Sequence, residues 1–181
     1  MNETLKTIHK RYTCRAYTGE MPPEADLRAV AEAALAAPSG MNGQPWHVIL
    51  VKDRALIAEM EAEGLTRVKA MPDQAISERL RGRGGTMYYH APCMLMITTR
   101  GGPADTGIII QTAALAAASL GIDNCICGMA GIAFEGERGD EFKQRLGFPE
   151  GYGHGLSLLM GYAATPGKAH ELDYNKISVV E

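Results

Sequence analysis

The chain has 181 residues, of which 46% are hydrophobic, and a formal net charge of -3. This length fits one globular domain, residues 1–181, with a core of useful size. The near-neutral charge and the absence of a basic cluster argue against a nucleic acid or a membrane surface as partner. The first residues lack the apolar core of a signal peptide, and the four cysteines show no CxxC spacing. We therefore expect a cytoplasmic protein with reduced thiols.

Two helices are predicted in the first part of the chain. Asn2 can cap a short helix, and residues 11–18 then break the pattern because their helix propensity is poor. A second helix with one apolar face is predicted over residues 22–37 and ends before Pro38.

The next segment predicts a strand, a helix and a loop. Residues 45–51 have almost no polar interruption, which predicts a strand buried on both faces with His47 as a structural residue. Asp53 is expected to cap a helix that runs through Glu61. Residues 64–86 are polar and contain glycines, and we expect the stretch SERLRGRGG to end in a mobile loop.

The second half of the chain alternates apolar strands with helices. The predicted elements are a buried strand over 91–99, an alanine-rich helix over 104–120, a short strand over 122–129, a surface helix over 139–147, and strands over 154–162 and 176–180. Alternating strands and helices indicate a mixed α/β or α+β protein. Because alanine permits close helix approach, helix 104–120 should pack between the sheet and another helix, of this chain or of a partner.

Several catalytic signatures are missing from the sequence. It contains no GxSxG elbow, no HExxH motif, no Walker loop and no GxGxxG after a strand. Its five histidines are not at metal-ligand spacing, so we predict no metal site.

A first candidate binding cluster follows the first helix. Arg11 and Arg15, four residues apart, flank Tyr12 and Thr13 at a turn. Guanidinium groups match phosphate oxygens, and a threonine hydroxyl with free N–H groups can complete an anion site. From the residues alone, a solvated basic patch is the alternative.

A second cluster is the turn-rich stretch APSGMNGQPWHVILV, which leads directly into the predicted strand over 45–51. Small residues such as Ser39 and Gly40 let a planar ligand lie close to the backbone. Asn42 and Gln44 offer amide donors and acceptors. An ordinary loop between a helix and a strand is the alternative.

A third cluster is the turn after the strand over 122–129. Cys127, Gly128, Met129 and Gly131 form a glycine-punctuated segment there. Its backbone N–H groups could contact a ligand, and a plain turn is the alternative.

Taken together and in this order, these motifs resemble the flavin-dependent nitroreductase family. The resemblance rests on RYTCRAYT, the APSGMNGQPW block, YYHAPCMLMITT, SLGIDNCICGM and LGFPEGYGHGLSLLMGY, and it spans about residues 5–165. It implies an α+β fold with a mainly antiparallel sheet flanked by helices. It further implies an intertwined homodimer with FMN in two interface clefts. Helix 104–120 would then pack at the interface, and strand 176–180 would join the partner's sheet.

The resemblance also implies which residues bind FMN. Arg11, Tyr12 and Thr13 would hold its phosphate. Arg15 would lie near the pyrimidine edge and ribityl chain, where its charge favours the anionic reduced flavin. The second subunit would line the ring with Pro38, Ser39, Gly40, Asn42 and Gln44.

Two further groups follow from the same resemblance. Gly128 and Met129, next to Cys127, match the segment whose backbone N–H approaches flavin N5. Many relatives carry paired basic residues near the C-terminus that complete the phosphate site. Here only Lys168 and His170 are available for that role.

The activity implied is that of an FMN-dependent oxidoreductase that uses NADH or NADPH. Nitroaromatic compounds, quinones or similar small molecules would be the electron acceptors, in a ping-pong cycle of hydride transfer through flavin N5. No side-chain acid or base is obligatory, because the chemistry belongs to the cofactor. The alternatives are other flavin chemistry (enone reduction, dehalogenation or flavin fragmentation), a flavin carrier or sensor without turnover, and a structural dimer without cofactor.

Overall fold

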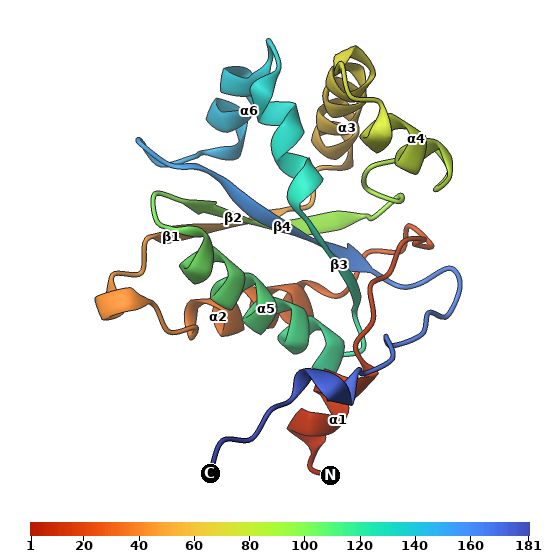
Figure 1. Cartoon of the computed structure of the whole chain (residues 1–181). Helices are drawn as coiled ribbons and strands as arrows, with labels where there is room; N and C mark the ends of the chain where they lie inside the picture. The colour runs from red at the N-terminus through yellow and green to blue at the C-terminus, as the bar shows by residue number, and fades with distance from the viewer.

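The protein is a three-layer α+β structure, described over residues 1–181 by a computed structural model (Figure 1). The middle layer is an antiparallel sheet in the order β1-β2-β4-β3. Its strands are β1 (Trp46–Val51), β2 (Cys93–Thr99), β3 (Asp123–Cys127) and β4 (Gly153–Gly161). This arrangement confirms the predicted α+β class and the mainly antiparallel sheet.

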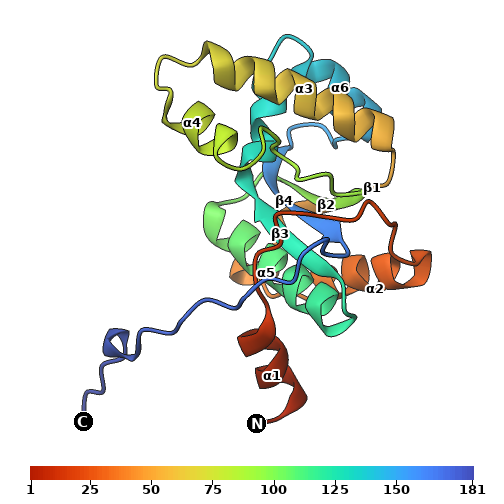
Figure 2. The same ribbon diagram turned by 90° about the vertical axis from the view of Figure 1, so that its right-hand side faces the viewer.

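Helices cover both faces of the sheet. On one face lie α2 (Glu24–Leu35) and α5 (Pro103–Ser119), side by side in both views (Figures 1 and 2). The other face carries α3 (Arg54–Ala70), α4 (Ala75–Arg81), the 3-10 helix η2 (Gly128–Glu135) and α6 (Gly139–Leu146). Helix α1 (Glu3–Lys10), capped by Asn2, lies against the C-terminal end of α5. None of these helices is long and apolar enough to cross a membrane.

Each face of the sheet has its own hydrophobic core. Successive side chains of a strand point to opposite faces, and β2 shows this directly. Its residues Met94 and Met96 belong to the core under α3 and η2, whereas Leu95 and Ile97 belong to the core under α2 and α5. β2 is a central strand and is buried on both sides. The prediction of a buried strand over 91–99 is therefore confirmed.

Helix α5 is buried along one stripe and exposed along another. Ile109, Ala113 and Ala117 face the core, while Ile108 and Gln111 are exposed. The predicted packing between the sheet and a second helix is confirmed, and that helix is α2 of the same chain. The exposed stripe of α5 is available for contact with another molecule.

The strand at 45–51 is an edge strand, so the prediction that it is buried on both faces is wrong. β1 pairs only with β2, and His47 is exposed while Val48 to Leu50 are half-buried. An apolar run does not distinguish a central strand from an edge strand whose outer side lacks cover within the chain.

The helix after Asp53 is longer than predicted. Helix α3 continues nine residues past Glu61, to Ala70, and α4 follows over residues 75–81. The loop expected at the end of SERLRGRGG is the turn over residues 82–85. Gly64 lies inside α3, and the Met87 side chain occupies the space beside it, 3.0 Å from where a Cβ would lie. Leu80, 3% exposed, fixes α4 to the core.

The tail forms no strand within the chain. Residues 164–181 are exposed, and only a 3-10 turn, Tyr174–Lys176, interrupts the extended backbone. The strand predicted over 176–180 is therefore not formed here, because no sheet edge of the same chain lies beside it. Figure 2 shows the tail running away from the body of the molecule.

The half-buried His154 gives the fold a testable pH dependence. Its Nε2 lies 3.0 Å from Ser157 Oγ, and its ring stacks on Phe134. Burial lowers its pKa to about 4, so the ring is neutral in the folded state at neutral pH. An unfolded histidine has a pKa near 6.5, so protons favour the unfolded chain below that pH.

We expect the free energy of unfolding to fall as pH drops from 6.5 to 4, with up to about 3 kcal/mol due to His154. Urea unfolding at several pH values checks this. His154→Gln should show a shallower decline than the parent over the same range. Equal declines in both proteins would contradict the assignment.

Candidate functional site

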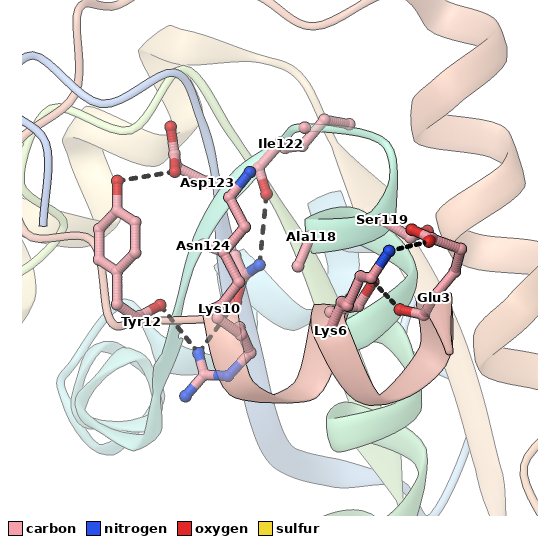
Figure 3. Close-up of a pocket in the computed structure, with 12 residues that line it drawn as sticks. Glu3, Lys6, Lys10, Tyr12, Ala118, Ser119, Ile122, Asp123 and Asn124 are labelled. Carbon is pink, nitrogen blue, oxygen red and sulfur yellow. Dashed lines mark hydrogen bonds and ion pairs between the residues drawn. The ribbon is translucent and has the colours of Figure 1, made fainter. Parts of the chain in front are cut away.

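A cavity of about 390 Å³ lies between α1, the end of α5 and the start of β3 (Figure 3). Arg11, Tyr12, Asp123 and Asn124 line it, together with Lys6 and other residues of α1. Figure 3 shows the Tyr12 hydroxyl directed at Asp123. Two predicted phosphate-binding residues, Arg11 and Tyr12, therefore face the same cavity.

Tyr12 ties three segments together. Its hydroxyl donates to Asp123 Oδ1 at 2.7 Å, and Asp123 Oδ2 accepts from the Ala163 N–H at 2.8 Å. Burial, followed by the bond to Asp123, raises the pKa of Tyr12 to about 12, so it remains a neutral donor. Gly167 packs on the Tyr12 ring, since a Cβ there would lie 2.2 Å from ring carbons. Lys168, the next residue, is exposed and follows this contact in the chain.

Arg11 is held by a buried amide. Its Nη1 donates to the Tyr12 carbonyl at 3.0 Å and to Asn124 Oδ1 at 3.3 Å. Asn124 is 2% exposed, and its Nδ2 donates to the carbonyls of Ala114 and Ile122. The other guanidinium nitrogens of Arg11 make no hydrogen bond within the chain, and Arg11 forms no ion pair. They are available to an anion.

A second cavity, of about 190 Å³, lies further along β3. Nine residues line it: Arg15, Arg79, Arg83, Tyr89, Cys125, Ile126, Cys127, Gly128 and Met129. Arg15 is thereby brought beside the Cys127–Met129 segment, as the predicted flavin site requires. Burial raises the pKa of the Cys125 thiol, while the charges of Arg15, Arg11 and Arg83 act to lower it.

The two cavities follow one strand. Asn124 lies at the first and Gly128 at the second, a separation of about 13 Å along extended backbone. In the first cavity the carboxylates have partners, because Glu3 pairs with Lys6 and Asp123 binds Tyr12 and Ala163. The surface along β3 therefore suits an elongated ligand with an anionic end.

The loop before β1 is strained and internally hydrogen-bonded. Three non-glycine residues, Met41, Asn42 and Gln44, have φ values of 52°, 54° and 43°. Ser39 Oγ accepts from the Gln44 N–H, and Gln44 Nε2 donates to Asn42 Oδ1, both at 2.9 Å. Left-handed backbone at non-glycine residues is unfavourable and concentrates at functional sites.

This loop lies far from the other predicted site residues of its own chain. The Gly40 N–H donates to Asp105 Oδ1 in the first turn of α5, whereas the Arg11 cavity reaches Ala118 and Ser119 at its end. From Asp105 to Ala118 the helix rises by about 20 Å. Figure 1 shows the loop and α1 near opposite ends of α5. Within one chain, the loop and the Arg11 cavity therefore lie at opposite ends of α5.

Three other predicted residues, Thr13, Pro38 and His170, are held by fewer contacts than Arg11 and Tyr12. Thr13 is half-buried, and its hydroxyl makes no hydrogen bond within the chain. Pro38 is exposed beside the strained loop. His170 lies exposed in the tail without a hydrogen bond.

Four residues that line the two cavities were missed by the sequence analysis. Asp123 and Asn124 are polar residues inside an otherwise apolar strand, and that mismatch was the available signal. Arg79 and Arg83 fell in a segment for which the sequence predicted no helix. Their position depends on α4, and the glycines of that segment argued against predicting this helix.

The fold is an α+β sheet with helices on both faces and basic residues in the cavities along β3, and comparison with known proteins specifies its family. The model of the nitroreductase family matches residues 8–162 of this chain. The chain belongs to that family.

A solved structure of very similar fold supports this membership. The crystal structure of a nitroreductase with bound FMN from Desulfitobacterium hafniense DCB-2 is 51% identical. It has a TM-score of 0.97, and the similarity covers 100% of both chains.

Two curated relatives match over shorter stretches. A protein of Archaeoglobus fulgidus, provisionally named NADH dehydrogenase/NAD(P)H nitroreductase, is 37% identical over 73 residues, 40% of this chain and 41% of that protein. An iodotyrosine deiodinase of Thermotoga neapolitana is 38% identical over 74 residues, 41% of this chain and 37% of that protein. Each match thus spans about two fifths of the curated relative.

Proposed function

We propose that this chain is an FMN-dependent oxidoreductase that takes electrons from NADH or NADPH and passes them to a small acceptor. Nitroaromatic compounds and quinones are the acceptor classes we expect, in a ping-pong cycle. The working unit is a homodimer with FMN in two interface clefts. One observation supports this proposal: the loop and the Arg11 cavity lie at opposite ends of α5, and we infer that a second copy completes each cleft.

The residues present fit FMN at its phosphate end. Arg11 offers unpaired N–H donors and Thr13 offers a free hydroxyl. The hydroxyl proton of Tyr12 is donated to Asp123, so Tyr12 holds the turn in place beside them. Lys168 follows the glycine that packs on Tyr12, and His170 lies two residues further. These groups would hold the phosphate by charge-assisted hydrogen bonds.

They also fit the flavin end. Bound FMN supplies two-electron redox chemistry between nicotinamide and acceptor. Arg15 places a fixed positive charge where negative charge develops on the reduced ring. Helix η2 begins at Gly128, and the first N–H groups of a helix have no intrahelical partner. The backbone of Gly128 and Met129 would therefore donate to the flavin edge, beside the Cys127 thiol.

The second copy would supply the opposite wall. In that loop Ser39 fixes the backbone of Gln44, and Gln44 fixes the Asn42 amide, so the polar groups are oriented before the ligand binds. Such preorganisation avoids an ordering cost on binding. The loop residues that would line the ring are Pro38, Ser39, Gly40, Asn42 and Gln44.

Exposed apolar surface supports the dimer. The α5 stripe carries Ile108, α1 exposes Leu5 and Ile8, and the tail exposes Ile177 and Val179. Apolar side chains gathered on projecting elements favour burial against a partner. We propose that residues 164–181 lie on the second copy and that 176–180 pairs with its sheet.

Reductive dehalogenation is the second candidate activity. It is favoured by the similarity to the Thermotoga neapolitana iodotyrosine deiodinase. A carrier or sensor without turnover would bind FMN through the same residues. Reduction by a nicotinamide nucleotide separates the reductase from that carrier.

The deciding experiment is an absorbance spectrum of the purified protein, taken before and after anaerobic NADH and then NADPH. The proposal expects a flavin spectrum that bleaches with one or both nucleotides and recovers on addition of a nitroaromatic compound or quinone. A flavin spectrum that neither nucleotide changes would contradict the reductase activity. No spectrum after reconstitution with FMN would contradict cofactor binding.

Arg11→Ala tests the phosphate assignment. It removes a charge-assisted contact of about 1.5–3 kcal/mol, so FMN should bind roughly 10- to 100-fold more weakly. Quenching of flavin fluorescence on titration measures this affinity. Arg67→Ala, which removes the same charge from exposed α3, should bind FMN like the parent. If Arg11→Ala keeps the parent affinity, the phosphate lies elsewhere.

A further inference from the structure

Two arginines of the second cavity have no role in the site described so far. Arg79 lies in α4 and Arg83 just after it, and both line the cavity with Arg15 and the Gly128–Met129 backbone. Neither belongs to the cluster around Arg11, which faces the other cavity. The phosphate end and these arginines are therefore separated along β3.

The position of this pair is set by α4 and the turn that follows it. Arg79 and Arg83 both line the second cavity, whereas Arg81, between them in sequence, lines neither cavity. The turn after α4 is held by two bonds to the Leu80 carbonyl, from the N–H groups of Arg83 and Gly85, each at 2.9 Å.

The segment that follows is fixed to α3. Glu61 Oε1 accepts from the Thr86 hydroxyl at 2.5 Å and from the N–H groups of Met87 and Tyr88 at 2.7 and 2.8 Å. These three bonds hold the chain between Arg83 and β2 in place. The two guanidinium groups thus extend from an anchored base.

The charge at this cavity is uncompensated. The lining contains three arginines and no acidic residue, and none of Arg15, Arg79 and Arg83 forms an ion pair. Like charges at this spacing repel one another. An anion bound between the guanidinium groups would be attracted to both and would offset this repulsion.

We propose that Arg79 and Arg83 bind the anionic group, a carboxylate or a phosphate, of the molecule that exchanges electrons with the flavin. This inference rests on the proposed function, because Arg15 and Gly128 mark the flavin end of the cleft. The protein is then selective for anionic substrates. The anion belongs either to a carboxylate-bearing acceptor or to the 2′-phosphate of NADPH.

Titration calorimetry on the protein as purified, with FMN added to saturation, tests binding without turnover. The matched probes are benzoate against benzamide, and NADP⁺ against NAD⁺. We expect the parent to bind the more anionic member of at least one pair about tenfold more tightly, in line with charge-assisted contacts. Arg79→Ala/Arg83→Ala should lose that preference, and the matched Arg81→Ala should keep it.

The two pairs distinguish the sources of the anion. A preference for benzoate alone identifies an acceptor carboxylate, and a preference for NADP⁺ alone identifies the donor phosphate. No preference in either pair overturns the inference. So does weaker FMN binding by the double variant, because the arginines would then serve the cofactor.

Steady-state kinetics separate this inference from the proposed function. With 4-nitrobenzoate and 4-nitrobenzamide as acceptors and each nucleotide as donor, the double variant should raise KM for the anionic substrate about tenfold, leaving kcat unchanged. An equal rise for neutral and anionic substrates overturns the inference. If the parent shows anion preference in calorimetry but no bleaching by nucleotides, the reductase proposal fails and the anion site stands.

Discussion

The length and rigidity of α5 impose the constraint on which the account of the site depends. The helix holds Asp105 against the strained loop at one end and Ala118 beside the Arg11 cavity at the other. A helix cannot shorten by the about 20 Å that separates them. The sequence nevertheless predicts ligand-binding residues at both ends. In the proposed dimer, a two-fold axis would bring the loop of each chain to the groove of the other.

Within one chain, a few polar contacts convert β3 into a binding surface. Asn124 is buried and fully engaged, and it directs Arg11 to the cavity. Asp123, at the start of β3, binds Tyr12 and the Ala163 N–H, which follows β4. Segments from near the two ends of the region that matches the family model therefore meet at β3. A buried polar group without such partners would cost about 1–3 kcal/mol, so these residues both stabilise the fold and define the site.

The sequence predicted best where a motif is local. The Arg11–Arg15 turn, the loop over 38–44 and the Gly128–Met129 turn each depend on neighbouring residues, and the fold class followed from their order. The sequence predicted less well those features in which burial depends on residues that are distant in the chain. The edge position of β1 and the helix through Gly64 are set by packing against β2 and Met87. A strand in the tail needs a sheet edge that one chain does not offer it.

The most direct test of the shared site is a hybrid dimer made by coexpressing two differently tagged variants. One carries Arg11→Ala and Arg15→Ala, and the other carries Asn42→Ala and Gln44→Ala. If each cleft combines the groove of one chain with the loop of the other, the hybrid has one intact cleft and binds about one FMN per dimer. The homodimer of each variant alone would then bind FMN weakly. If the hybrid binds FMN as weakly as these two homodimers, each site lies within one chain and the account is wrong.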